Sequence, residues 1–247
     1  PYAPLYTKDD AKDAGRKLHG VNYDEAVALG EHITATFHEA GHILGSACIE
    51  VHVTENGATQ TVLFSGDLGQ RDKPFIGDPS HFKRADYVIM ESTYGDREHR
   101  EAGPIDKQLA DVMPGTYARG GNHLVPSLAI ERCQALMYHF GLLMDQGFVP
   151  RMPVYLDSPM AVDVTSVFRK YRDWMDDETR AMIEAGHTPL EFDGLHMTRR
   201  REDSKAINTA PGPKIIMAGS GMCTGGRIKH HLRQNIMRPD STILFVG

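Results

Sequence analysis

The densest group of potential metal ligands is the segment His38–Cys48, which reads HEAGHILGSAC. Taken alone it fits the HExxH pattern, in which His38 and His42 bind zinc and Glu39 is the general base of a metallopeptidase. That chemistry requires a helix, because two imidazoles four residues apart reach one metal only from one helical face. The flanking segments ITATF and IEVHV are β-rich, and two glycines inside the motif disfavour a helix. The peptidase is therefore an alternative and not our leading hypothesis.

Two further carboxylates stand where predicted strands end. Asp67 follows a strand in FSGDLG, and Glu91 follows another in VIMESTYGDR. A carboxylate at a strand end beside glycines can approach a metal closely and can bridge two ions. Together with His42 they form three strand ends with suitable groups, and sites are usually built from loops at one rim of a sheet. The pattern favours a metal site, although Asp67 taken alone suits the cap of a turn equally well.

A second group of candidate residues lies in the C-terminal half. The segment Gly219–Arg227, GSGMCTGGR, follows a predicted strand, and its four glycines leave backbone N–H groups free to meet an anion. It lacks the GK[ST] ending of a Walker loop, and a plain tight turn is the alternative. Behind it, Lys229 and Arg233 lie on one side of a predicted helix and would follow phosphates. Arg132 comes after another strand and would bind a phosphate or form an ion pair.

Hydrophobic periodicity predicts the elements that must hold these residues. The first part of the chain is predicted to contain a helix at 8–19, opened by the capping pair Thr7 and Asp10, and strands at 32–37, 47–53, 61–64 and 86–90. Asn56 and Gly57 suit a hairpin turn between two of these strands, which indicates an antiparallel sheet. The second part is predicted to contain helices at 105–117, 128–144, 160–174, 177–185 and 224–234 and strands at 123–126, 154–156, 214–218 and 242–246. Helices between single strands favour a parallel sheet, so we expect two domains, residues 1–104 and 105–247.

Composition limits the class of protein. The chain has 247 residues, 27 Lys or Arg against 33 Asp or Glu for a net charge of −6, and 40% hydrophobic residues, enough for a core. No apolar run approaches the roughly 18 to 20 residues of a membrane span. Three scattered cysteines form no disulfide framework, which fits a reducing compartment. We expect a soluble cytoplasmic protein without a membrane partner, in which a local basic groove would have to hold any nucleic acid.

The order of the motifs resembles that of a known family. GHILGS, FSGDLG, ESTYGDR, GGNHLVPSLAIERCQ, VYLDSPMA and MAGSGMCTGGRIKHHL follow one another along nearly the whole chain. This order resembles the β-CASP branch of the metallo-β-lactamase superfamily, which includes bacterial and archaeal RNA nucleases. The resemblance implies an α/β fold, with a partial metallo-β-lactamase domain of the αββα sandwich type and an inserted β-CASP domain with a mainly parallel sheet. It also implies zinc-dependent hydrolysis of RNA at a two-zinc site.

The resemblance also implies roles for single residues. His42 would bind zinc, and Asp67 would be the catalytic carboxylate that bridges both ions, where they activate a water and neutralise charge on the phosphoryl oxygens. Glu91 would be the acid that orients a catalytic histidine. His38 is then expected to be a packed or supporting side chain, and Asp157 to line the cleft or cap a helix. The candidate RNA-binding residues are Ser127, Arg132, Ser220, Gly221, Arg227 and Lys229.

The sequence also departs from the family. The HxHxDH cluster and the two C-terminal histidine motifs of the family are absent. We therefore expect an incomplete and inactive part of a zinc-dependent ribonuclease, with a partial or empty zinc site and exposed apolar surface. A non-catalytic RNA-binding or scaffolding subunit and an HExxH zinc peptidase are the alternatives. RNA is the expected partner, and a homodimer is left open.

Overall fold

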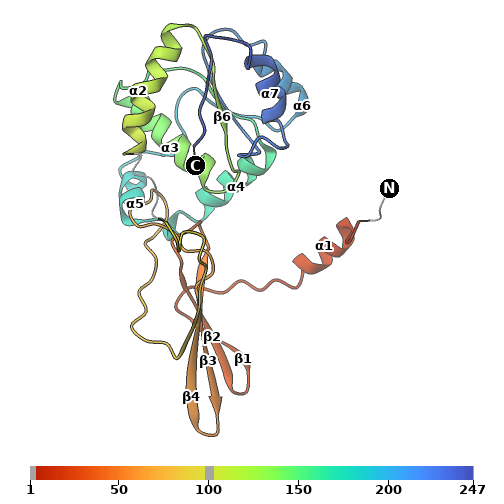
Figure 1. Ribbon diagram of the computed structural model, residues 1–247, viewed down its shortest axis with the longest axis vertical. Helices are drawn as coiled ribbons and strands as arrows, with labels where there is room; N and C mark the ends of the chain where they lie inside the picture. The colour runs from red at the N-terminus through yellow and green to blue at the C-terminus, as the bar shows by residue number, and fades with distance from the viewer. Residues whose placement is uncertain (1–3, 98–102, 247) are drawn as a thin grey trace. The chain divides into compact units, whose positions relative to one another are not determined.

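The computed structural model describes residues 4–97 and 103–246, which fall into two compact units (Figure 1). The first unit comprises Pro1–Ala40, Gly45–Leu68 and Pro79–Glu91. The second comprises Gly41–Leu44, Gly69–Asp78 and Ser92–Gly247. The predicted boundary between residues 104 and 105 stays a prediction.

The first unit is built on one mostly antiparallel sheet with the strand order β1-β2-β3-β4-β5. Its strands are β1 (Ala26–Gly30), β2 (Ile33–Glu39), β3 (Ala47–Glu55), β4 (Ala58–Phe64) and β5 (Tyr87–Ile89). Strands β1 to β4 pair antiparallel, and β5 adds in parallel beside β4. Asn56 and Gly57, at φ of 52° and 79°, form the turn of the β3–β4 hairpin. The predicted hairpin is confirmed, because two-residue hairpin turns require positive φ at both positions.

The rest of the first unit has little buried apolar surface. Helix α1 (Lys8–Gly15) begins with the predicted capping box of Thr7 and Asp10, and none of its residues is buried. A small core forms around Ala40, Cys48 and Leu63. The three residues of β5 are all exposed, Ile89 the least at 55%, so the expected exposed apolar surface is present at this strand.

The second unit contains a five-stranded sheet with the order β10-β6-β9-β7-β8. Its strands are β6 (His123–Pro126), β7 (Val154–Leu156), β8 (Leu195–Met197), β9 (Ile215–Ala218) and β10 (Thr242–Ile243). Every pair of neighbouring strands is parallel. The predicted α/β fold with a mainly parallel sheet in the C-terminal half is therefore confirmed.

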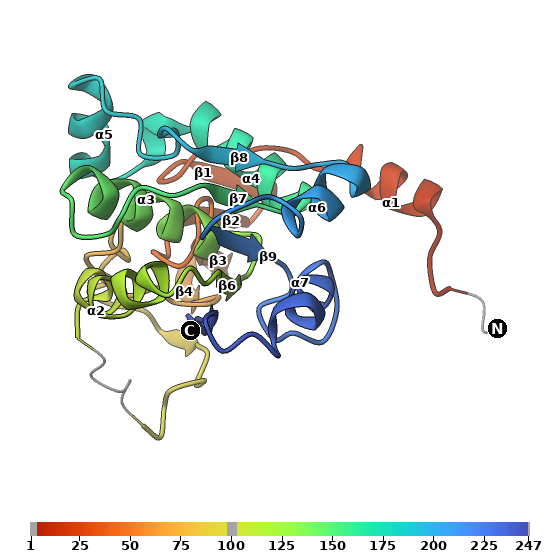
Figure 2. The same cartoon turned by 90° about the horizontal axis from the view of Figure 1, so that it is seen from above.

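Helices cover both faces of this parallel sheet. They are α2 (Ile105–Ala118), α3 (Arg132–Asp145), α4 (Pro159–Lys170), the 3-10 helix η1 (Arg172–Trp174), α5 (Asp177–Glu184), α6 (Arg201–Ile207) and α7 (Ile228–Asn235). Right-handed crossovers send α3 and α4 to one face and α6 and α7 to the other. Figure 2 shows α2 and α3 on the opposite side of the sheet from α6 and α7. The main core joins α2, α3 and the central strands through Met113, Phe140, Leu156 and Ile215, all fully buried.

Two predicted helices begin four residues later than expected. Helix α3 begins at Arg132 and not at residue 128, because Glu131 has a φ of 65°. Helix α7 begins at Ile228 and not at residue 224, because Gly226 has a φ of 72°. A positive φ cannot continue a right-handed helix, so in both cases a loop extends past the strand end.

None of the helices among residues 4–97 and 103–246 combines the length and the apolar character needed to cross a lipid bilayer.

Candidate functional site

The HExxH segment does not form the helix that a zinc peptidase requires. His38 and Glu39 lie in strand β2, opposite Cys48 and Ala47 of β3. Neighbouring residues of a strand point to opposite faces of the sheet, and residues 41–44 form a bend and turns after the strand ends. The peptidase geometry is therefore absent from this segment.

His38 is a packed side chain in the first unit. Its Nδ1 lies 2.6 Å from Asp24 Oδ1, and its ring meets the Phe82 ring edge-on with 5.1 Å between centroids. The side chain is 17% exposed. This environment agrees with the expectation that His38 packs or supports and does not bind substrate.

The two strand-end carboxylates of the first unit share one rim. Glu91 Oε1 accepts a hydrogen bond from the backbone N–H of Leu68 at 2.7 Å, and the Glu91 N–H donates to Ser65 Oγ at 3.1 Å. The Ser65 N–H donates to Ile89 O at 2.9 Å, so the ends of β4 and β5 are bound directly to each other. Asp67 is exposed in the turn next to Leu68. The structure thus places Glu91 against the turn that contains Asp67, and the functional roles of both residues stay predictions.

His42 lies in a segment of the second unit that contacts Gly69. A Cβ on Gly69 would lie 1.5 Å from Gly41 O and 2.5 Å from the His42 N atom, so no side chain fits at residue 69. Gly69 comes two residues after Asp67 in the sequence. The second glycine of FSGDLG is therefore required for a close backbone contact with the segment that carries His42.

These residues do not complete a metal site on their own. Within the described ranges, no group of three or more His, Cys, Asp or Glu side chains is arranged to hold a metal ion. A zinc ion takes four ligands in structural sites and at least three from the protein in most catalytic sites. The described residues therefore do not fit a complete zinc site, and His42 and Asp67 stay predicted ligands.

A second set of predicted residues meets at the carboxyl ends of β6 and β9. The Ser127 N–H donates to Ala218 O at 3.1 Å, and a Cβ on Gly221 would lie 3.4 Å from the Leu128 N atom. The loop after β6 leads to α3, whereas the loop after β9 leads to α7 on the other face of the sheet. Open α/β sheets bind their ligands at positions of this kind. The structure brings together Ser127, Ser220 and Gly221.

The glycine-rich loop after β9 is closed by its own contacts. Ser220 Oγ accepts a hydrogen bond from the Gly225 N–H at 3.3 Å, and a Cβ on Gly226 would lie 2.1 Å from Gly219 O. In the part of the chain that the structure describes, the backbone N–H groups of Gly221 and Met222 donate no hydrogen bond. Such N–H groups can receive a phosphate oxygen.

The predicted basic residues differ in what they contact. The Arg227 side chain is 23% exposed; its Nη1 donates to Asp157 Oδ1 at 2.7 Å and its Nη2 to Arg199 O at 2.8 Å. Arg132 is half-buried and Lys229 is exposed, and the side chains of both lack a partner within residues 4–97 and 103–246. Arg132 and Lys229 are therefore available for a phosphate, whereas each terminal nitrogen of Arg227 already donates one hydrogen bond within the protein.

Asp157 is the most extensively bonded residue of this region, which the sequence did not reveal. It follows β7 and is fully buried, and it accepts hydrogen bonds from Thr198, Ser204, Arg227 and His231. Burial alone would raise the pKa of Asp157, but the bonds from these four residues outweigh it and hold the pKa well below its usual range. The sequence shows only an Asp directly after a short apolar strand, which does not reveal the residues that bond to it.

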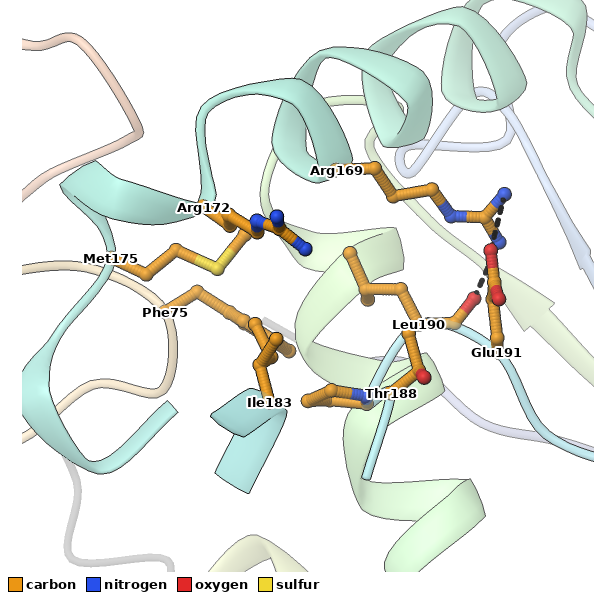
Figure 3. Close-up of a pocket in the computed structure, with 9 residues that line it drawn as sticks. Phe75, Arg169, Arg172, Met175, Ile183, Thr188, Leu190 and Glu191 are labelled. Atoms are coloured by element: carbon orange, nitrogen blue, oxygen red, sulfur yellow. Dashed lines mark hydrogen bonds and ion pairs between the residues drawn. The ribbon is translucent and has the colours of Figure 1, made fainter. Parts of the chain in front are cut away.

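A pocket of about 230 Å³ lies elsewhere in the second unit (Figure 3). It is lined by apolar side chains, including Phe75 and Leu190, and by Arg169 and Arg172. Arg169 is already bound by Glu191 at 3.0 Å and by Leu190 O at 2.8 Å. Because α4 starts at the carboxyl edge of the sheet and runs back, its last turn with Arg169 lies toward the opposite edge. The pocket is therefore separate from the residues around Ser127 and Ser220.

Comparison with known proteins places these observations in context. Residues 133–247 match the Beta-Casp domain family. The chain is 38% identical over 245 residues to ribonuclease TTHA0252 of Thermus thermophilus. This alignment covers 99% of this chain and 55% of the ribonuclease. It is 31% identical over 232 residues to transcription termination factor FttA of Methanosarcina mazei, covering 92% of this chain and 36% of the factor. For FttA of Pyrococcus horikoshii the identity is 29% over 249 residues, 99% and 38% of the two chains. The chain thus spans about half of the ribonuclease and little more than a third of the factors.

Proposed function

This chain belongs to the β-CASP branch of the metallo-β-lactamase superfamily, and from that membership we propose that it takes part in the zinc-dependent hydrolysis of RNA phosphodiester bonds. The observation that carries the proposal is the shared rim of Asp67 and Glu91, joined through the bond from Leu68 N–H to Glu91 at 2.7 Å. A turn held in this way keeps a metal-binding carboxylate beside an acid that can orient a neighbouring group.

Zinc dependence is part of this proposal. His42 and Asp67 offer an imidazole and a carboxylate, which are ligands that zinc prefers. When bound, zinc would supply a water of lowered pKa and neutralise charge on the phosphoryl oxygens. The remaining ligands would come from outside the described residues, since these contain no group of three ligands.

The RNA backbone would lie along the carboxyl edge of the parallel sheet. The unbonded N–H groups of Gly221 and Met222 would meet phosphate oxygens, with Ser127 and Ser220 beside them. Lys229 would add a positive charge from the first turn of α7. Contacts of this kind hold the backbone and carry no sequence preference.

A second candidate function is supported by the missing ligands. A non-catalytic RNA-binding subunit needs the phosphate-binding edge and does not need a complete metal site. Within the described residues, the N–H groups of Gly221 and Met222 that donate no hydrogen bond support such binding, and no group of three metal ligands is present. The subunit would bind RNA without cleaving it.

Incubation of the full-length protein with end-labelled RNA separates the two functions. The ribonuclease predicts cleavage that a chelator stops and that added zinc restores. The RNA-binding subunit predicts binding of the same RNA with no cleavage, whether zinc is present or not. Absence of both binding and cleavage would contradict both functions.

A further inference from the structure

Asp157 binds helix α7 at two points that are one helical turn apart. Its Oδ1 accepts from Arg227 Nη1 at 2.7 Å, and its Oδ2 pairs with His231 Nε2 at 2.7 Å. Residues four apart share one side of a helix, so both contacts hold the same face of α7. His231 and Asp157 are fully buried, which makes these bonds strong and their loss costly.

The glycine-rich loop, residues 219–227, is held at both ends. At its start, Gly219 O accepts a hydrogen bond from the Ile228 N–H at 3.1 Å. At its end stands Arg227, held by Asp157. Gly226 packs so closely on Gly219 that a Cβ there would lie 2.1 Å from Gly219 O. The path of the loop, and the direction of its unbonded N–H groups, therefore depend on where Asp157 holds Arg227.

Arg227 itself is poorly placed to bind a phosphate. A guanidinium binds phosphate most strongly with two parallel N–H groups. Both terminal nitrogens of Arg227 are already bound, one by Asp157 Oδ1 at 2.7 Å and one by Arg199 O at 2.8 Å. A direct contact with RNA would have to use the remaining N–H groups of a side chain that is only 23% exposed.

We propose that Asp157 is a positioning residue, which holds Arg227 and α7 so that residues 219–227 keep their RNA-binding shape, and that Arg227 acts through this bond without touching RNA. The inference rests on the proposed function, since it concerns the RNA-binding edge. It replaces the expectation that Arg227 binds the substrate directly. The phosphate contacts are instead made by the loop backbone and Lys229.

The test measures the affinity of the chain for a short single-stranded RNA by fluorescence anisotropy at several salt concentrations. The variants are Asp157→Asn, Arg227→Gln, the double variant of these two, and Lys229→Gln. Arg199→Gln is the matched control, because it removes one positive charge near Arg227 but leaves the Arg199 carbonyl that Arg227 binds. Thermal unfolding of each variant is recorded in parallel.

Asp157→Asn and Arg227→Gln are each expected to weaken RNA binding about tenfold, as for other supporting contacts. The double variant weakens it no further, since the two residues act as one unit. Arg227→Gln keeps the wild-type salt dependence, whereas Lys229→Gln reduces its slope by about 0.7, the value for one phosphate contact in a single strand. Arg199→Gln binds like the wild type.

Several results would overturn the inference. Additive losses, or a reduced salt slope for Arg227→Gln, would mean that Arg227 touches RNA. Unchanged affinity in a folded Asp157→Asn variant would mean that Asp157 only stabilises the fold. If Asp157→Asn does not fold, Arg227→Lys is measured in its place. This variant keeps the positive charge but cannot bind both Asp157 and the Arg199 carbonyl as the guanidinium does. Unchanged RNA affinity of Arg227→Lys would then contradict the inference. A wild-type chain that does not bind RNA would refute the proposed RNA-binding edge itself, and this inference with it.

Discussion

Glu91 accepts a hydrogen bond from the backbone N–H of Leu68 at 2.7 Å, which joins the end of β5 to the turn that contains Asp67. The Glu91 carboxylate therefore stabilises this turn, in addition to the role in catalysis that we propose for it. Its second link, from the Glu91 N–H to Ser65 Oγ at 3.1 Å, uses the backbone and does not depend on the side chain.

Two substitutions of Glu91 separate the effect of its hydrogen bond to Leu68 from the effect of its negative charge. Glu91→Gln keeps an oxygen that can accept from Leu68 N–H but removes the negative charge. We expect RNA cleavage by the full-length protein to fall about 10- to 100-fold while its zinc content stays at the wild-type level. Glu91→Ala also releases Leu68, so both cleavage and zinc content should fall. Equal zinc loss in the two variants would contradict this division.

Gly69→Ala tests the contact between Gly69 and the segment that carries His42. The new Cβ would lie 1.5 Å from Gly41 O, so the backbone has to move. We expect a loss of about 1–3 kcal/mol in the free energy of unfolding, measured with urea. Gly30→Ala is the control, because a Cβ there meets nothing within 4 Å. Similar stability of the two variants would show that the contact is not tight.

Arg132→Gln tests whether this partly buried arginine binds a phosphate. Its side chain has no partner in the described ranges, so its charge is available to RNA. The slope of log affinity against log salt should fall by about 0.7. The control is Arg151→Gln, since Arg151 is exposed and already paired with Asp145 at 2.7 Å. An unchanged slope for Arg132→Gln would remove it from the interface.

His123 makes the stability of the chain depend on pH. Burial lowers its pKa from 6.5 to about 4, although Nε2 donates to Met113 O at 3.2 Å. Between these two values the unfolded chain binds a proton and the folded chain does not, so stability falls as the pH falls. At pH 4 the loss in the free energy of unfolding that is due to His123, relative to neutral pH, reaches about 3 kcal/mol.

Urea unfolding at a series of pH values checks this prediction. His123→Leu should lose less stability than the wild type between pH 7 and pH 4.5. His230→Leu, which replaces an exposed histidine with the same leucine side chain, is measured in parallel. Parallel curves for the wild type and His123→Leu would contradict the role of His123.

Much of the fold could be predicted from periodicity and turn chemistry. Strands β6 and β7 have the predicted bounds, because a short apolar run between polar turns leaves few other choices. The hairpin turn at Asn56 was predictable because few residue pairs accept positive φ. Strands β1 and β8 and helix α6 were missed. Strand β8 has a histidine between its two apolar residues, so no continuous apolar run marks it, and the seven residues of α6 are too few to show a helical period.

The site could be predicted in part. Ser127 and Gly221 were predicted separately as RNA-binding residues, and the structure places the two loops that carry them together, because the carboxyl ends of neighbouring parallel strands meet at one edge. The bond between Asp157 and His231 joins residues 74 positions apart, and it became visible only in the folded chain. Sequence spacing carries no information about such pairs, so the bonds from Arg227 and His231 to Asp157 could not be predicted.

The most direct test of the proposed function compares Asp67→Asn with Glu39→Gln in the full-length protein. Both variants remove one carboxylate charge, and only Asp67 is proposed to take part in the metal site. The measurement is the rate of RNA cleavage together with the zinc content. We expect Asp67→Asn to lose cleavage and zinc, while Glu39→Gln keeps both near the wild-type level. Full RNA cleavage by Asp67→Asn, or loss of activity in Glu39→Gln alone, would contradict a ribonuclease site at Asp67.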